Sequence, residues 1–156
     1  MLWNSNVWKY NCYWYTEFSG DVLWWSRGKQ THNNISNTDD VAFDDEGNVI
    51  YSSYSQNKVR KQDKAGNVLF SYTHEKLKDP YGLAVGRNGE IFVGGFSSNN
   101  IHILSGSGKL LRILEEIEKP KWIKFQIDTS RLFVMESGIR NGIRNQESLP
   151  VHCSLE

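Results

Sequence analysis

Residues 40–51, Asp-Val-Ala-Phe-Asp-Asp-Glu-Gly-Asn-Val-Ile-Tyr, are repeated in outline by residues 82–93, Gly-Leu-Ala-Val-Gly-Arg-Asn-Gly-Glu-Ile-Phe-Val. The two segments align with an offset of 42 residues and need no gap. The alignment continues through residues 54–69, which fall on residues 96–111. Apolar positions fall on apolar positions and turn glycines fall on turn glycines, a match that chance does not explain. The sequence therefore contains two copies of one repeat.

Each copy holds four short runs of β-branched and aromatic residues, separated by Gly, Asn, Asp and Ser. In the second copy the runs are Gly82–Val85, Glu90–Gly94, Ile101–Leu104 and Leu110–Leu114. Short runs at this spacing predict antiparallel strands joined by tight turns. A four-stranded sheet that recurs about every 42 residues is typical of a β-propeller blade. We therefore predict an all-β chain that forms an incomplete antiparallel β-propeller.

Weaker copies flank the two full ones. Pro120 aligns with Pro80, and residues 132–134 align with residues 91–93 after one inserted residue. Residues 18–24 resemble residues 64–70, which predicts part of a blade at the other end. The predicted divisions are a partial blade of outer strands at 1–28, a linker at 29–37, full blades at 38–77 and 78–117, a partial blade at 118–145 and a frayed tail at 146–156.

The segment 110–118 is ambiguous when it is taken alone. Its leucines and Ile117, with glutamates between them, also fit an amphipathic helix. The matching segment 67–70 of the first copy has no helical pattern, and two copies of one repeat should share one fold. We therefore predict a strand over 110–114, with a helical turn over 114–118 as the alternative.

Residues 40–51, together with 80–85 and 89–93, resemble the NHL repeat. The shared pattern is a proline, a glycine and an apolar strand, followed by a glycine turn and a second apolar strand that ends in small residues. The sequence is most similar in style to the carboxy-terminal propellers of tripartite-motif proteins. That resemblance implies a ligand-binding platform attached to a ubiquitin ligase, with the ligase activity in a separate zinc-binding domain.

The chain departs from the NHL pattern in two respects. The family often places Asp after its second strand, whereas Ser53, Gly95 and Glu136 stand there in the successive copies. Family rings also contain more blades than this chain holds. A missing neighbour exposes the apolar face of a blade, at a cost of about 1.5–3 kcal/mol for each large side chain. We expect a fragment, a truncated product, or a chain that self-associates or receives missing blades to complete the ring.

The composition excludes several classes of protein. The chain has 18 Lys and Arg against 18 Asp and Glu, so it is not polybasic as nucleic-acid and membrane-surface proteins often are. No apolar run reaches the ~18 residues of a membrane span, and the first residues lack the features of a signal peptide. We therefore expect a cytoplasmic protein without a membrane partner. The two cysteines lie near opposite ends and cannot form a disulfide framework.

The sequence carries no motif for nucleophilic, phosphate-binding or metal-dependent catalysis, so we expect no enzyme activity, cofactor or metal site. His102 lies between Ile101 and Ile103 and is interpreted as a strand residue on a polar or partly buried face. Some propellers similar to the NHL family are lyases that hold zinc with histidines from successive blades, but His102 aligns with Arg60. A metal-dependent lyase or lactonase-like propeller remains as an alternative.

The loops between the second and third strands, and the linkers between blades, should gather on one face of a propeller. Aromatic, amide and basic residues in them suit a protein contact, and they also suit single-stranded RNA, whose bases stack on rings. The balanced charge favours a protein partner, with single-stranded RNA as the second candidate. We therefore predict a non-catalytic recognition module. The candidate partner-binding residues are Tyr54, Gln56, Asn57, Lys58, Tyr81, Phe96, Asn99, Asn100, Lys119, Lys121, Trp122 and Arg140.

Overall fold

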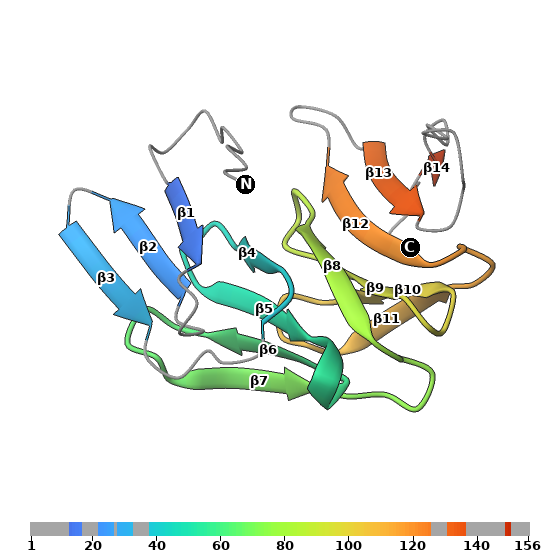
Figure 1. Ribbon diagram of the computed structural model, residues 1–156, viewed down its shortest axis with the longest axis horizontal. Coiled ribbons are helices and arrows are strands. Elements are labelled where there is room, and N and C mark those ends of the chain that lie inside the picture. Colours follow the sequence, from blue (N-terminus) through green and yellow to red (C-terminus); the bar gives the residue numbers. More distant parts are fainter. Residues whose placement is uncertain are drawn as a thin grey trace.

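The computed structural model describes residues 13–16, 22–26, 28–32, 38–125, 131–136 and 149–150. These residues form four antiparallel sheets that follow one another around an open arc (Figure 1). One 3-10 turn, η1 (Tyr54–Gln56), is the only helical segment in the described ranges. The strands are β1 (Tyr13–Thr16), β2 (Val22–Ser26), β3 (Gly28–His32), β4 (Val41–Phe43), β5 (Val49–Ser53), β6 (Lys58–Gln62), β7 (Val68–Tyr72), β8 (Pro80–Val85), β9 (Ile91–Gly95), β10 (Asn100–Leu104), β11 (Leu110–Leu114), β12 (Pro120–Phe125), β13 (Arg131–Glu136) and β14 (Leu149–Pro150).

The two full copies of the repeat form two four-stranded sheets with the same register. Ala42 lies opposite Ile50 in the β4–β7 sheet, and Ala84 lies opposite Phe92 in the β8–β11 sheet. The third and fourth strands also share a β-bulge, after Lys61 in one sheet and after its repeat equivalent in the other. The prediction of antiparallel four-stranded blades is therefore confirmed, down to single residue pairs.

The turn between the first and second strands explains one of the repeated glycines. Gly47 and Gly89 have φ values of +80° and +82°. This left-handed region is accessible to glycine without strain but costly for a residue with a Cβ. The same residue type at the same position lets both copies reverse direction within a five-residue loop and keep the second strand in register.

The ambiguous segment 110–118 begins as a strand. β11 pairs with β10 over Leu110–Leu114, so the strand prediction is confirmed. Residues 115–118 have no regular structure, and Ile117 is buried against the adjoining sheets. The helical pattern was misleading because apolar residues at the end of an outer strand and in a linker can both face the core.

The outer sheets follow the weaker copies of the repeat. In the β12–β14 sheet, Ile123 lies opposite Val134, as Leu83 lies opposite Val93 one repeat earlier. The first sheet contains a third strand, β3, at residues 28–32, where the sequence predicts a linker beginning at residue 29. This strand could not be recognised from the sequence because its residues are mostly polar. An edge strand pairs on one side only and does not need an apolar pattern. The predicted frayed tail, apart from 149–150, lies outside the described residues.

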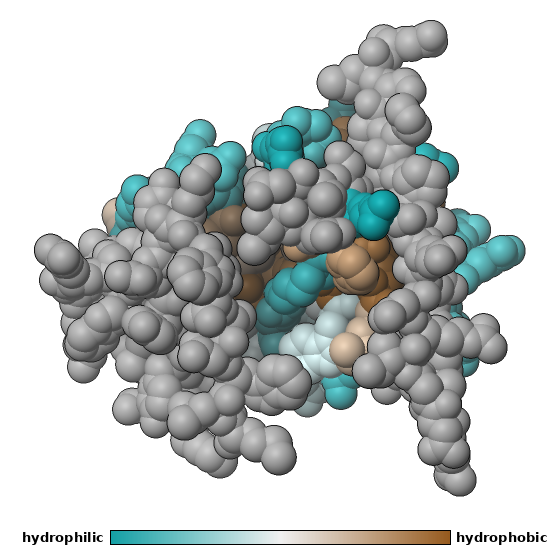
Figure 2. Space-filling view, turned by 90° about the horizontal axis from the view of Figure 1, so that it is seen from above, coloured by the Kyte–Doolittle hydropathy of each residue, from teal (hydrophilic) through white to brown (hydrophobic). Residues whose placement is uncertain are grey.

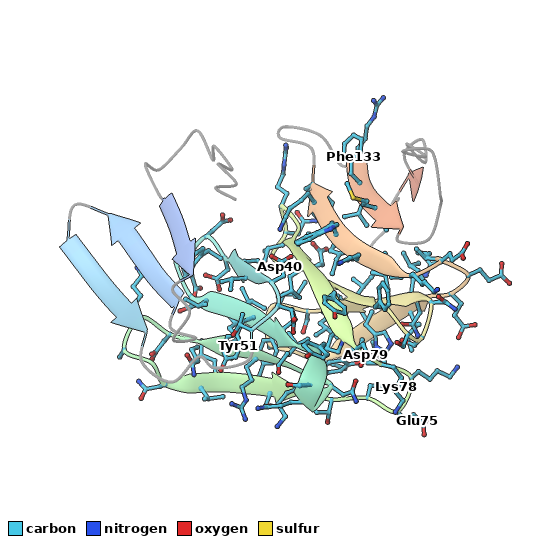
Figure 3. The ribbon with its side chains drawn as sticks, viewed as in Figure 1. Asp40, Tyr51, Glu75, Lys78, Asp79 and Phe133 are labelled. Atoms are coloured by element: carbon cyan, nitrogen blue, oxygen red, sulfur yellow. The ribbon has the colours of Figure 1, made fainter. Side chains whose placement is uncertain are left out.

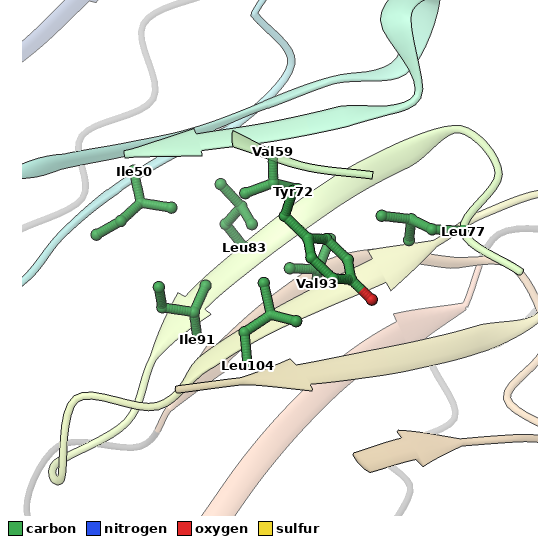
Figure 4. Packing of buried hydrophobic residues seen from close by; sticks show 8 residues of the cluster. All are labelled: Ile50, Val59, Tyr72, Leu77, Leu83, Ile91, Val93 and Leu104. Carbon is green, nitrogen blue, oxygen red and sulfur yellow. The ribbon is translucent and has the colours of Figure 1, made fainter. Parts of the chain in front are cut away.

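Two apolar clusters lie between the sheets formed by β4 to β13. The larger lies between the β4–β7 and β8–β11 sheets, and its buried members are Ile50, Val59, Tyr72, Leu77, Leu83, Ile91, Val93 and Leu104 (Figure 4). The other lies between the β8–β11 sheet and β12–β13, with the buried members Ala84, Phe92, Ile101, Ile103, Ile117, Ile123 and Leu132. Since neighbours along a strand point to opposite faces, the β8–β11 sheet contributes alternate residues to both clusters.

The spacing between sheets depends on small residues. A Cβ on Gly82 would lie 2.8 Å from the carbonyl oxygen of Lys121, and one on Gly94 would lie 2.7 Å from that of Pro120. These glycines therefore allow β8 and β9 to approach the backbone of β12. The corresponding residues of the β12–β13 pair are Trp122 and Met135.

One face of the β12–β13 pair is apolar and open to solvent. Trp122 is 45% exposed, Met135 is 53% exposed, and Phe133 lies on the same face (Figure 3). Within the described part of the chain no further sheet packs on this face. No helix among the described residues is both long enough and apolar enough to cross a membrane.

Candidate functional site

The site begins at the turn η1, which follows β5. The backbone N–H of Tyr54 donates to Oδ2 of Asp39 at 2.7 Å, and the carbonyl of Tyr54 accepts the N–H of Asn57 at 3.1 Å. Asn57 closes the turn in the left-handed conformation, with φ of 46°. These contacts fix the backbone of Tyr54 while its side chain stays 45% exposed.

An aromatic cluster brings residues from three sheets together. The ring of Tyr54 stacks on that of Tyr81, with centroids 5.5 Å apart and an angle of 4° between the planes. Phe96 meets Tyr81 edge to face, with centroids 5.3 Å apart. The ammonium group of Lys121 lies 5.9 Å from the Tyr81 centroid. We call Tyr54, Tyr81, Phe96 and Lys121 the aromatic cluster; all four are among the residues that the sequence predicts to contact a partner.

The repeat explains why these residues meet. Tyr54 and Phe96 occupy the same position in two copies, 42 residues apart, directly after the second strand. Tyr81 and Lys121 each follow the proline that begins the first strand of the next sheet. Stacking one sheet on the next therefore places each loop aromatic near the start of the following inner strand. The cluster therefore lies on the face of the arc, here called the loop face, where the loops after β5 and β9 meet the starts of β8 and β12.

Two of the predicted binding amides form hydrogen bonds within the fold. Oδ1 of Asn57 accepts the backbone N–H of Asp79 at 2.7 Å, and Oδ1 of Asn99 accepts that of Lys119 at 3.0 Å. Both asparagines and both donor residues have positive φ values, between 43° and 52°. Each asparagine therefore fixes the linker that leads to the next sheet. The contact is made at the residue directly before the proline that begins that sheet.

The other predicted residues are dispersed. Asn100 is buried and its amide donates to the carbonyl of Lys76 at 2.8 Å, so it too serves the fold. Trp122 belongs to the open apolar face of β12–β13. Gln56 and Lys119 are exposed near the cluster and Lys58 is half-buried, whereas Arg140 lies outside the described residues.

The cluster lies in a region of unmatched negative charge. Burial raises the pKa of Asp39, the hydrogen bond from Tyr54 opposes that effect, and the charges of Asp40 and Asp79 raise the pKa further. Burial, which is the largest cause, and the charges of Asp39, Tyr54 and Asp79 also raise the pKa of the Tyr81 hydroxyl. Asp79, which directly precedes β8 (Figure 3), accepts a hydrogen bond from Ser97. Among the described residues, neither Asp39 nor Asp79 forms a salt bridge.

A buried histidine lies beside the linker between β7 and β8. His102 lies in strand β10, as predicted, but it is fully buried and not only partly so. Nε2 of His102 is 3.3 Å from the carbonyl oxygen of Lys76, and Nδ1 is 2.8 Å from the hydroxyl of Tyr72. A carbonyl can only accept, so Nε2 carries the proton and Nδ1 accepts from Tyr72. Burial lowers the pKa of His102 to about 4.

The distance between His102 and the other histidines along the sequence did not predict which residues surround its ring. The ring of His74, in the linker, lies 5.2 Å from that of His102. The sequence predicted a strand at His102, whereas the burial of all five residues of β10 is evident only from the structure. Among the described residues, no three His, Cys, Asp or Glu side chains are grouped so that they could hold a metal ion.

No protein-family model matches the sequence, and no curated protein matches it. Several solved structures are similar in fold. The chain matches a streptogramin B lyase with a TM-score of 0.65 and 18% identity, over 80% of this chain and 44% of that one. It matches virginiamycin B lyase from Staphylococcus aureus with a TM-score of 0.66 and 20% identity, over 84% and 47%. It matches the Pan2 WD40 domain from Neurospora crassa with a TM-score of 0.60 and 16% identity, over 85% and 45%.

These similarities confirm the β-propeller fold, which is partial and unclosed in this chain. The chain spans about half the length of the structures that it matches, between 44% and 47%. At 16–20% identity the likeness concerns the fold alone.

Proposed function

We propose that this chain is a non-catalytic recognition module that binds a protein partner through the aromatic cluster. The observation that carries the proposal is the stack of Tyr54 on Tyr81, which presents a nearly half-exposed ring on the loop face. Tyrosine is enriched among the residues that dominate protein–protein binding energy, because it offers a large rigid surface with a polar end. The internal hydrogen bonds of the Tyr54 backbone keep the cost of ordering low.

Single-stranded RNA is the second candidate, since bases also stack on tyrosine rings. The charges near the cluster favour a protein. A phosphate group that approached Tyr54 would come close to Asp39 and Asp79, whose charges have no salt-bridge partner in the described part of the chain. RNA binding relies on basic groups that neutralise phosphates, and no lysine of the described residues forms a salt bridge with either carboxylate.

The finer proposal concerns the family and the rest of the ring. We propose an NHL-type propeller of the tripartite-motif kind, in which this chain recognises the substrate of a ubiquitin ligase; the repeat of residues 40–51 at 82–93 supports it. Further blades, from a longer chain or a second copy, would cover the open face of Trp122, Phe133 and Met135. Two of the similar structures are lyases, but a likeness of fold does not carry their activity to this chain.

A peptide-display selection tests the proposal. A random dodecapeptide library is selected on the wild-type chain and, in parallel, on Tyr54→Ala and on Leu111→Ala, a control with an equally exposed residue on the outer strand β11. We expect peptides that bind the wild type and Leu111→Ala, and at least about tenfold weaker binding to Tyr54→Ala. Equal binding to all three proteins would overturn the proposal. So would binding of a random single-stranded RNA that depends on Tyr54 and weakens steeply with salt.

A further inference from the structure

We infer that the partner presents a cationic side chain, arginine or lysine, which packs on the exposed ring of Tyr54 and pairs with Asp39. This inference rests on the proposed function and names the chemical class that the same site recognises. It also separates the proposed protein partner from RNA, because the group that enters the site is positive.

The ring of Tyr54 is prepared for such a contact. One face of the ring is taken by the parallel ring of Tyr81, and the residue remains 45% exposed. A cation over the face of a tyrosine ring gains about 0.5–1 kcal/mol at exposed sites and more when it is desolvated. The planar guanidinium of arginine can stack on the ring while its N–H groups reach a carboxylate.

Asp39 supplies the carboxylate. Its Oδ2 atom accepts the N–H of Tyr54 at 2.7 Å, which holds the carboxylate beside the residue whose ring is exposed. Two other half-buried aspartates of the described residues pair with a lysine, Asp40 with Lys124 and Asp44 with Lys61, whereas Asp63 and Asp79 do not. Asp39 has no such partner among the described residues, and Asp40 and Asp79 are close enough to oppose its ionisation. A cation from a partner would relieve that repulsion, whereas a phosphate would increase it.

Lys121 determines which end of the cluster the cation takes. Its ammonium group already lies 5.9 Å from the centroid of the Tyr81 ring. A second cation at Tyr81 would be repelled, so the free position is at Tyr54, near Asp39. Seen from above, the described residues in the middle of the molecule include both polar and apolar ones (Figure 2).

The experiment begins with the peptides selected on the wild-type chain. We expect arginine and lysine to be enriched relative to the unselected library. The best arginine peptide is then compared with its citrulline analogue, which has the same shape and no charge, on wild type and on Asp39→Asn. Affinity for the arginine peptide should fall about tenfold with Asp39→Asn, whereas affinity for the citrulline peptide should change little. Glu75→Gln removes a negative charge from an exposed residue of the β7–β8 linker and should leave both affinities unchanged.

The outcomes separate the two proposals. Peptides that depend on Tyr54 but show no preference for arginine or lysine would overturn the cationic contact and leave the recognition module standing. Equal loss for the arginine and citrulline peptides on Asp39→Asn would also overturn it, because the effect would then come from the turn and not from charge. If no peptide depends on Tyr54, the recognition site itself is wrong.

Discussion

The ammonium group of Lys124 lies 3.3 Å from a carboxylate oxygen of Asp40, a residue that precedes it by 84 positions. The same oxygen accepts the backbone N–H of Leu83 at 2.8 Å, and Lys124 also donates to the carbonyl of Leu83 at 3.2 Å. Asp40 precedes β4, Leu83 lies in β8 and Lys124 lies in β12. One carboxylate therefore connects the first strands of three sheets.

The two ends of this contact should differ in their effect on stability. Asp40→Ala removes the acceptor for two backbone N–H groups, those of Val41 and Leu83, and should lower the free energy of unfolding by about 2 kcal/mol. Lys124→Ala breaks an ion pair whose lysine is largely exposed and should cost less than about 1 kcal/mol. Urea unfolding followed by circular dichroism measures both. A larger loss for Lys124→Ala would contradict the hydrogen-bonding role of Asp40.

The approach of adjacent sheets should be sensitive to a single methyl group. Gly94→Ala places a Cβ against the backbone of Pro120 and should lower the free energy of unfolding by about 1–3 kcal/mol. Gly86→Ala is the matched control, since its nearest contact would be the end of the flexible Glu90 side chain at 3.1 Å. Thermal unfolding of both variants checks the prediction. Equal stability would mean that β9 and β12 are farther apart than the structure places them.

The asparagines of the loop face should affect folding and not recognition. Asn57→Ala leaves the N–H of Asp79 without its acceptor and puts alanine in a left-handed conformation, so unfolding should become easier by about 1–2 kcal/mol. Asn57→Gly keeps the conformation and should recover part of the loss. Affinity for the selected peptides, measured by fluorescence anisotropy, should stay within a factor of about two in both variants. Strong loss of binding with unchanged stability would return Asn57 to the set of binding residues.

Acid should destabilise the fold through His102. Its pKa is about 4 in the folded chain, against an ordinary value of 6.5, so the unfolded chain binds the proton more readily. The stabilising contribution is complete above pH 6.5 and is lost as pH falls toward 4, on the order of 2 kcal/mol in total. His102→Gln should be less stable than wild type at neutral pH and should show a smaller loss on acidification. His74→Gln should retain the wild-type slope, and a flattened slope in that variant would contradict the assignment to His102.

The sequence predicted the sheets because the relevant signals are local. Short apolar runs at Val49 and Ile91, with a glycine turn before each, determine which residues pair across neighbouring strands. A second copy with the same spacing resolved the one ambiguous segment, at 110–114. The polar strand β3 was missed because an edge strand carries little of this signal.

The candidate site depends only partly on such signals. The repeat register was enough to predict that Tyr54 and Phe96 share a face. It did not show that Tyr54 would stack on Tyr81, that Asn57 would turn toward Asp79, or that His102 would be enclosed by Tyr72 and the Lys76 carbonyl. Strand pairing within a sheet follows from the order of residues along the chain. Contacts between sheets follow from how closely two faces can pack, which depends on small residues such as Gly82 and Gly94 and is decided only when the whole arc has formed.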